Sequence, residues 1–83
     1  MQSEDLWLLV QEFTKANSKE KLENLLKGLL TPSEIQEFAQ RIRLVRMLKE
    51  GIGQHEIAAK LKIGVATVTR GSKELQEGNF KYV

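Results

Sequence analysis

Apolar residues recur at helical spacing along the first third of the chain. One stripe consists of Leu6, Leu9, Val10 and Phe13, with Trp7 beside it, and a second consists of Leu22, Leu25, Leu26 and Leu29. Each stripe follows the i, i+3, i+4 spacing of residues on one face of an amphipathic helix. Between them, Asn17 followed by Glu20 resembles a capping box and predicts the start of the second helix. The leucine face of that helix needs another apolar surface to cover it.

The strongest local signal for a helix start lies at Thr31. Thr31 suits the N-cap, Pro32 the first helical position and Glu34 the position whose side chain returns to the N-cap. The predicted core face of this third helix consists of Ile35, Phe38, Ala39, Ile42, Val45 and Leu48. Gly51 is placed to end the helix as a C-cap glycine. Residues 63–69 are rich in β-branched side chains but do not alternate, so no strand is predicted.

Residues 54–72 contain two short helical stretches separated by a turn. Ile57, Ala58 and Leu61 share the inner face of the first stretch, Lys62-Ile63-Gly64 forms the turn, and Val65 and Val68 face back from the second stretch. Two helices that cross steeply need a small residue such as Ala58 at their contact. The outer face of the second stretch presents Ala66, Thr67, Thr69 and Arg70. These side chains suit contacts with base edges and phosphates, so the pattern is typical of a helix-turn-helix, although a helical hairpin without DNA-binding function has a similar pattern.

The size of the chain points to a partner subunit. A domain of 83 residues buries a limited share of its surface, and such domains often need a disulfide, a metal or a second subunit. The chain has no cysteine, and a single histidine, His55, offers no metal-ligand cluster. We therefore expect a homodimer without a bound metal.

Charge is distributed unevenly along the chain. Residues 1–30 carry five acidic and four basic side chains, a balance of −1, whereas residues 31–83 carry six acidic and nine basic ones, a balance of +3. All four arginines lie in the second part, at Arg41, Arg43, Arg46 and Arg70. The planar guanidinium fork suits phosphate and carboxylate, so this part of the chain is expected to bind an anionic partner.

Several classes of protein do not fit the sequence. No apolar run approaches the length that spans a bilayer, and no signal-peptide pattern opens the chain, so a cytoplasmic protein is expected. With no cysteine, no glycine-rich phosphate loop and no base placed near Ser72, no nucleophile or acid–base pair can be nominated. An enzyme is therefore not expected.

The stretch from Leu30 to Leu75 closely resembles the tryptophan (trp operon) repressor family. The resemblance rests on Leu30-Thr31-Pro32, Arg41-Ile42-Arg43, Gly51, Gln54, Glu56 and the run from Ala66 to Ser72. It implies an all-α, intertwined homodimer, with residues 1–51 as dimerisation helices and residues 54–72 as the helix-turn-helix. Each helix-turn-helix would read half of a palindromic operator; the family is itself a standard example of this docking geometry. The implied activity is transcriptional repression, with L-tryptophan as the corepressor.

The family's ligand site can be carried over to this chain position by position. The resemblance implies that Arg41 and Arg70 sandwich the indole ring and that Arg70 also binds the carboxylate. The remaining implied ligand contacts are Thr31, Thr67 and Val45 as lining residues, Gly71 as the small residue that leaves room, and the partner's backbone carbonyls at Gly28 and Leu30. Glu74 stands where the family usually has a serine that helps to hold the ammonium group. Its carboxylate either binds the ammonium more strongly or pairs with Arg70 and blocks the site.

The implied DNA contacts lie at the start of the first short helix and along the second one. They are Gln54, His55, Val65, Ala66, Thr67, Thr69, Arg70 and Lys73. Two positions depart from the family: His55 replaces an arginine that contacts DNA, and Lys62 replaces a turn glycine. A left-handed lysine at position 62 would cost about 1 kcal/mol.

Three functions remain open on the sequence. The first is a tryptophan-dependent repressor. The second is a related DNA-binding regulator that does not respond to tryptophan, and the third is a helical interaction module that binds no DNA.

Overall fold

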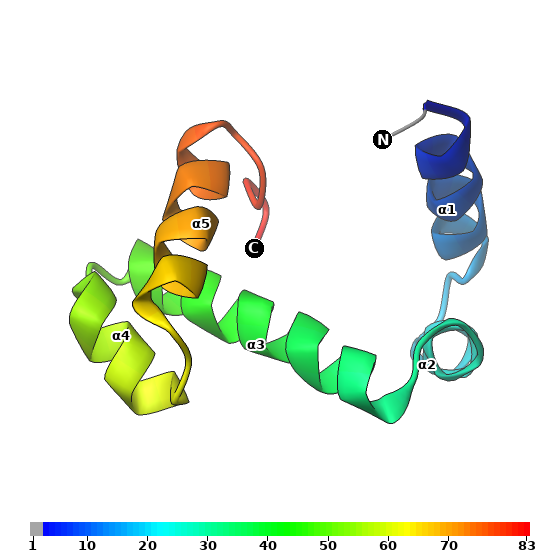
Figure 1. Ribbon diagram of the computed structural model, residues 1–83. Coiled ribbons are helices and arrows are strands. Elements are labelled where there is room, and N and C mark those ends of the chain that lie inside the picture. The colour runs from blue at the N-terminus through cyan, green and yellow to red at the C-terminus, as the bar shows by residue number, and fades with distance from the viewer. Residues whose placement is uncertain (1–2) are drawn as a thin grey trace. The chain divides into compact units, whose positions relative to one another are not determined.

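The computed structural model describes residues 3–83, and this part of the chain is helical without strands. Its five helices are α1 (Ser3–Lys15), α2 (Lys19–Leu29), α3 (Pro32–Lys49), α4 (Gln54–Leu61) and α5 (Val65–Gln76) (Figure 1). The predicted all-α class is confirmed. Two compact units divide the chain, one reaching Ile35 and the other comprising residues 36–83. None of the helices in residues 3–83 combines the length and the apolar character that crossing a membrane requires.

In the first unit, α2 begins one residue later than the sequence predicts. Ser18 is the N-cap, in an extended conformation, and its Oγ accepts a hydrogen bond of 3.2 Å from the backbone N–H of Lys21. The capping box predicted at Asn17 is therefore wrong, and the amide oxygen of Asn17 instead accepts from Nζ of Lys21 at 3.5 Å. Serine and asparagine cap helices about equally well, so local preference did not distinguish two adjacent candidates.

The start of α3 is the one that the sequence predicts. The backbone N–H of Glu34 donates to Oγ1 of Thr31 at 3.1 Å, and the backbone N–H of Thr31 donates to Oε1 of Glu34 at 2.9 Å. These two bonds form a reciprocal capping box and satisfy two backbone donors that the first turn leaves unpaired. The predicted capping box is confirmed.

Neither α1 nor α2 contains a buried residue. Trp7 is 64% exposed, Leu6 is 51% exposed and Leu29 is 49% exposed. Apolar faces of this kind are amphipathic helix surfaces that a single copy of the chain leaves in contact with water.

The core lies in the second unit, where α4 and α5 pack on the C-terminal half of α3 (Figure 1). Its buried residues are Leu44, Val45, Ile57, Ala58 and Val68. Part of the predicted core face of α3 is wrong: Ile35, Phe38 and Ile42 are exposed, and Leu44, which the stripe did not include, is buried. The apolar stripe runs the full length of α3, but α4 and α5 cover only one end of it.

Left-handed residues end the helices of the second unit. At the end of α3, Gly51 has a φ of 83° and the backbone N–H of Ile52 donates to the carbonyl of Met47 at 3.1 Å, which is a Schellman motif and confirms the predicted C-cap. At the end of α4, Lys62 has a φ of 57° and takes the same role without the freedom of glycine. This backbone conformation costs a lysine about 1 kcal/mol relative to glycine, so the turn into α5 is held by the packing around it.

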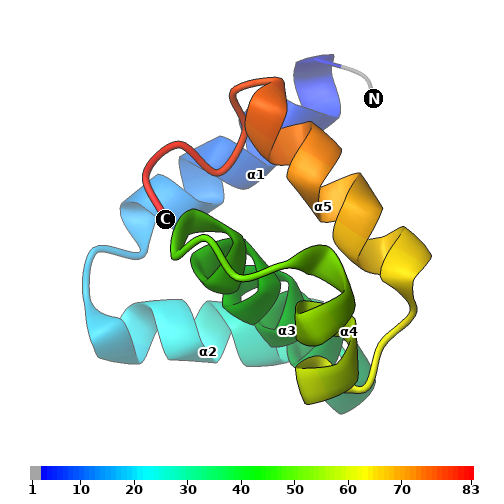
Figure 2. The same cartoon turned by 90° about the vertical axis from the view of Figure 1, so that its left-hand side faces the viewer.

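The chain continues beyond the end predicted for the last helix. α5 runs to Gln76, and Gly78, with a φ of 96°, turns the chain so that it runs back towards the C-terminal end of α3 (Figure 2). There the Nζ of Lys49 donates to the carbonyls of Phe80 at 2.7 Å and of Lys81 at 3.4 Å. Lys49 thereby fixes the segment that follows α5 against α3.

Gly71 of α5 packs directly against the side chain of Leu44 on α3. A Cβ atom built on Gly71 would lie 2.9 Å from Cδ1 and 3.3 Å from Cδ2 of Leu44, whose side chain is buried. Real Cβ atoms do not come this close, so any larger residue would have to displace Leu44 or the helix. The two helices touch at this point because residue 71 has no side chain.

We expect Gly71→Ala to destabilise the protein by about 1 to 3 kcal/mol, since the added methyl group overpacks the contact with Leu44. Urea unfolding followed by circular dichroism, at one fixed protein concentration, measures this change. Gly28→Ala is the matched control, because a Cβ at this α2 position meets no atom within 4 Å and alanine favours a helix. A Gly71→Ala protein as stable as the parent would show that the contact does not limit the approach of the helices.

Candidate functional site

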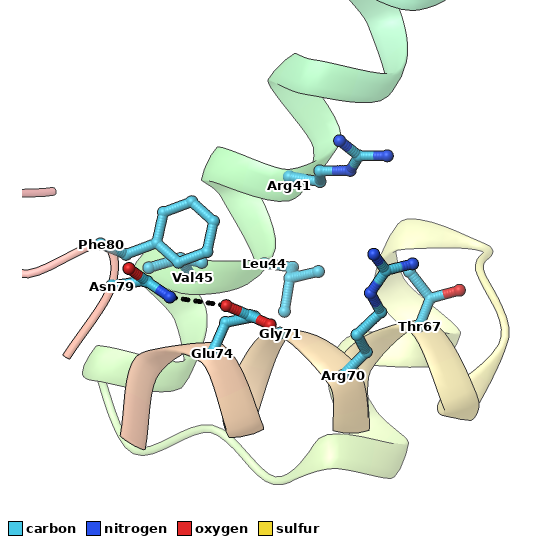
Figure 3. Close-up of a pocket in the computed structure, with 9 residues that line it drawn as sticks. All are labelled: Arg41, Leu44, Val45, Thr67, Arg70, Gly71, Glu74, Asn79 and Phe80. Atoms are coloured by element: carbon cyan, nitrogen blue, oxygen red, sulfur yellow. Dashed lines mark hydrogen bonds between the residues drawn. The ribbon is translucent and has the colours of Figure 1, made fainter. Parts of the chain in front are cut away.

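A pocket with a volume of about 460 Å³ lies between α3, α5 and the segment that follows α5 (Figure 3). Its lining residues are Arg41, Leu44, Val45, Thr67, Arg70, Gly71, Glu74, Asn79 and Phe80. A pocket of this volume is large enough for an amino acid with a bicyclic side chain.

The structure brings most of the predicted ligand contacts together in this pocket. Those that line it are Arg41, Val45, Thr67, Arg70, Gly71 and Glu74. The other three predicted contacts, Gly28, Leu30 and Thr31, belong to the first unit, where Thr31 caps α3. The role of each residue towards a ligand stays a prediction.

The sequence did not indicate Leu44, Asn79 or Phe80 as lining residues. Asn79 and Phe80 follow the turn at Gly78, and a glycine just beyond a helical stretch is the usual signal for such a C-terminal turn. The sequence predicted a last helix that ends at Ser72, so the predicted site did not include this turn.

Two arginines form a positive end of the pocket. Arg41 projects from α3 and Arg70 projects from α5 on the same side of it (Figure 3). The Arg41 guanidinium lies 5.4 Å from the centre of the Phe38 ring on the preceding turn of α3, a cation–π contact. The ion pairs and hydrogen bonds of residues 3–83 do not include the Arg70 guanidinium. Two cations without a carboxylate between them are suited to an anionic group.

Glu74 faces the pocket from the next turn of α5. Its Oε2 accepts a hydrogen bond of 2.6 Å from Nδ2 of Asn79 (Figure 3). Of the two alternatives that the sequence leaves for Glu74, pairing with Arg70 is not the arrangement in this structure. The carboxylate therefore keeps its negative charge available to the pocket, because the amide that holds it is neutral.

The floor of the pocket is apolar and rigid. Leu44 and Val45 are core residues with exposed fractions of 2% and 0%, and Phe80 is half-buried against the same core. Gly71 lies beside them and adds no side chain. A flat apolar group is the kind of ligand part that such a floor accommodates.

The predicted DNA contacts lie mainly on the exposed surface of α4 and α5. The exposed ones are His55, Val65, Ala66, Thr67, Thr69, Arg70 and Lys73, and Gln54 is half-buried. The prediction that Val65 faces the core is wrong, since it is 37% exposed in the first turn of α5. Val68, predicted to face inward with it, is fully buried.

Two hydrogen bonds join α4 to its neighbouring helices, one to α5 and one to α3. Oγ1 of Thr69 donates to Oε1 of Gln54 at 2.8 Å, so the side chains at the start of α4 and in the middle of α5 hold each other. Nε2 of Gln40 on α3 donates to the carbonyl of Leu61 at 3.2 Å. This bond satisfies a carbonyl at the end of α4 that has no partner within the helix. The orientation of α4 therefore depends on contacts with both neighbouring helices.

Comparison with known proteins covers nearly the whole chain. A family model described as Trp repressor protein matches residues 4–83. Over 75 residues the chain is 32% identical to a Trp operon repressor homolog of Xylella fastidiosa (strain M23), an overlap of 89% of this chain and 82% of the relative. Over 72 residues it is 36% identical to a Trp operon repressor homolog of Vibrio vulnificus (strain YJ016), an overlap of 84% of this chain and 71% of the relative.

A third relative shows similar overlap. The chain is 39% identical over 72 residues to a Trp operon repressor homolog of Vibrio cholerae serotype O1 (strain ATCC 39315 / El Tor Inaba N16961), covering 84% of this chain and 70% of the relative. No solved structure gave a significant match to the chain.

Proposed function

This chain belongs to the Trp repressor family, and from that premise we propose that it represses transcription as a homodimer that binds operator DNA when L-tryptophan occupies the pocket. The family is one of regulatory DNA-binding proteins and not of enzymes. The observation that carries the proposal is the sharing of Thr67 and Arg70 between the pocket and the exposed face of α5. A ligand in the pocket would touch the same helix that touches DNA.

For DNA, α4 and α5 with the turn at Lys62–Gly64 act as the helix-turn-helix, and α5 enters the major groove. The hydrogen bond from Thr69 uses the amide oxygen of Gln54, so the amide NH₂ of Gln54 remains as a donor for the DNA backbone. Lys73 and Arg70 contribute charge towards phosphates, and Thr69 has its methyl group to offer to a base edge.

For the ligand, the indole ring lies on the apolar floor between the two guanidinium groups of Arg41 and Arg70. Cation–π contact with both arginines stabilises the ring, and the carboxylate accepts hydrogen bonds from Arg70. The ammonium group then faces Glu74 and the partner's backbone carbonyls at Gly28 and Leu30.

The coupling between ligand and DNA follows from the position of the pocket. A ring held between α3 and α5 fixes the distance of α5 from α3, and in a dimer it fixes the separation of the two α5 helices. If L-tryptophan favours the arrangement that fits DNA, then DNA must tighten the binding of L-tryptophan by the same factor.

The second candidate function is that of a DNA-binding regulator that does not respond to tryptophan. The observation in its favour is that the chain supplies an aromatic ring of its own, Phe80, to the wall of the pocket. In that case α5 would be held in place by the segment that follows it.

The dimer is proposed because of the apolar surface that the single chain leaves exposed. The exposed apolar residues include Trp7 and Leu29 in the first unit and Phe38 in the second, and α1 and α2 contain no buried residue. An isologous contact between two copies would cover the same patch on both.

We expect millimolar L-tryptophan to strengthen the binding of a selected palindromic duplex by about tenfold or more, within the usual range of allosteric coupling. The duplex is selected by the wild-type protein from a random-sequence pool, and fluorescence anisotropy measures its dissociation constant with and without L-tryptophan. Arg41→Ala removes one face of the ring site, so it should lose most of this response and keep the ligand-free affinity.

The matched control for this experiment is Arg46→Ala, which removes an exposed arginine of α3 that does not line the pocket. It should respond to L-tryptophan as the wild type does. Wild-type affinity that is the same at zero and at millimolar L-tryptophan would reject the corepressor and leave the tryptophan-independent regulator. Failure to enrich any duplex would reject both.

We also expect sedimentation equilibrium to give the mass of two chains at micromolar concentration. Replacing Trp7 and Phe38 together by serine should shift the equilibrium towards monomers, because it removes two large apolar side chains that the single chain leaves exposed. A compact and stable wild-type monomer would contradict the proposed assembly.

A further inference from the structure

Arg70 and Glu74 are opposite charges that do not pair, although they lie four residues apart on α5. Side chains at this spacing are neighbours on a helix, and opposite charges there attract each other. In residues 3–83 ion pairs at this spacing form between Glu23 and Lys27 at 3.2 Å and between Glu56 and Lys60 at 3.3 Å. In both the acidic residue comes first, which is the more favourable order, whereas Arg70 precedes Glu74. No ion pair in this range joins Arg70 to Glu74.

Asn79 makes two hydrogen bonds to Glu74, one to its backbone and one to its side chain. Its backbone N–H donates to the carbonyl of Glu74 at 3.0 Å, and its Nδ2 donates to Oε2 of Glu74 at 2.6 Å. The backbone bond belongs to the turn at the end of α5, where Gly78 has a φ of 96°. This turn places the side-chain amide of Asn79 next to the Glu74 carboxylate. Nζ of Lys49 donates a hydrogen bond of 2.7 Å to the carbonyl of Phe80 and so fixes the residue that follows Asn79.

We propose that Asn79 is a positioning residue, which holds the Glu74 carboxylate away from Arg70 and so keeps two separate charged ends in the pocket. This inference rests on the proposed function, in which the pocket is the corepressor site. Without Asn79, the Glu74 carboxylate would be free to approach Arg70, and an ion pair between them would offset both charges. The amide of Asn79 fixes the carboxylate without cancelling its charge.

The separated charges define the class of ligand. The arginine end binds an anionic group, the Glu74 end binds a cationic one, and Leu44, Val45 and Phe80 contact an apolar part. An aromatic α-amino acid in its zwitterionic form has these three parts. An analogue that lacks the amino group would leave the Glu74 carboxylate without its cation, so the site selects against it.

Titration calorimetry with two probes tests this selection. L-tryptophan has all three parts, whereas 3-indolepropionate keeps the ring and the carboxylate and lacks the amino group. We expect the wild type to bind L-tryptophan about tenfold more tightly than 3-indolepropionate, as for the loss of one charged hydrogen bond. Glu74→Gln should remove most of this preference. Glu77→Gln, which removes an exposed carboxylate outside the pocket, should leave it unchanged.

The role of Asn79 is tested by a pair of variants. Asn79→Ala should weaken the binding of both probes by about twofold, the strength of an ion pair one helical turn apart, because Glu74 then pairs with Arg70. The double variant Asn79→Ala, Glu74→Gln should bind 3-indolepropionate as well as Glu74→Gln alone does. If Asn79→Ala binds both probes like the wild type, or if the double variant does not recover, Asn79 has no positioning role.

A measurement without ligand separates this inference from the proposed function. The Nε–H signal of Arg70 in the NMR spectrum of the free protein should shift in Asn79→Ala and return in the double variant, since only the single variant allows the ion pair. An unchanged signal overturns the inference even if L-tryptophan binds. The expected shift, together with no binding of L-tryptophan, supports the positioning role and rejects the corepressor function.

Discussion

The contact between Gly71 of α5 and Leu44 of α3 is the constraint on which the site depends. A side chain at position 71 would collide with Leu44 at 2.9 Å, so the buried Leu44 side chain occupies the space that such a side chain would need. Thr67, Arg70 and Glu74 lie within about one helical turn of this contact and project beside it. The pocket therefore lies beside this contact, and two of the residues that line it, Leu44 and Val45, belong to the buried core.

That core is small and includes only part of the chain. The buried side chains come from the second half of α3 and from α4 and α5. The first half of α3 and the whole of α1 and α2 keep their apolar faces exposed in the single chain. One part of the chain thus has a buried interior beneath the site, and the other has apolar faces that the single chain leaves exposed.

Local signals in the sequence predicted local structure well. The capping box of Thr31 and Glu34 and the C-cap at Gly51 were predictable because each depends on neighbours within a few residues. The ligand-site residues on α3 and α5 came from resemblance to a family, and the structure brings six of them around one pocket.

The misplaced cap at Asn17 was a local error between two adjacent residues, whereas the other errors come from packing between distant parts of the chain. Phe38 was predicted in the core and Leu44 was left out of it, because the sequence does not show where α4 and α5 end their cover of α3. The state of Glu74 depended on Asn79, beyond a helix end that had been placed too early. No pattern on α5 alone distinguishes a carboxylate held by that amide from one paired with Arg70.

The most direct test of the account is to locate L-tryptophan on the protein by NMR. In ¹⁵N-labelled wild-type protein titrated with L-tryptophan, the largest amide shifts should fall on residues 41–45, 67–74 and 79–80, which surround the pocket. Slower hydrogen exchange along α5 should accompany them, since the ligand fixes this helix against α3. Amides at these positions that do not change at millimolar L-tryptophan would contradict the account.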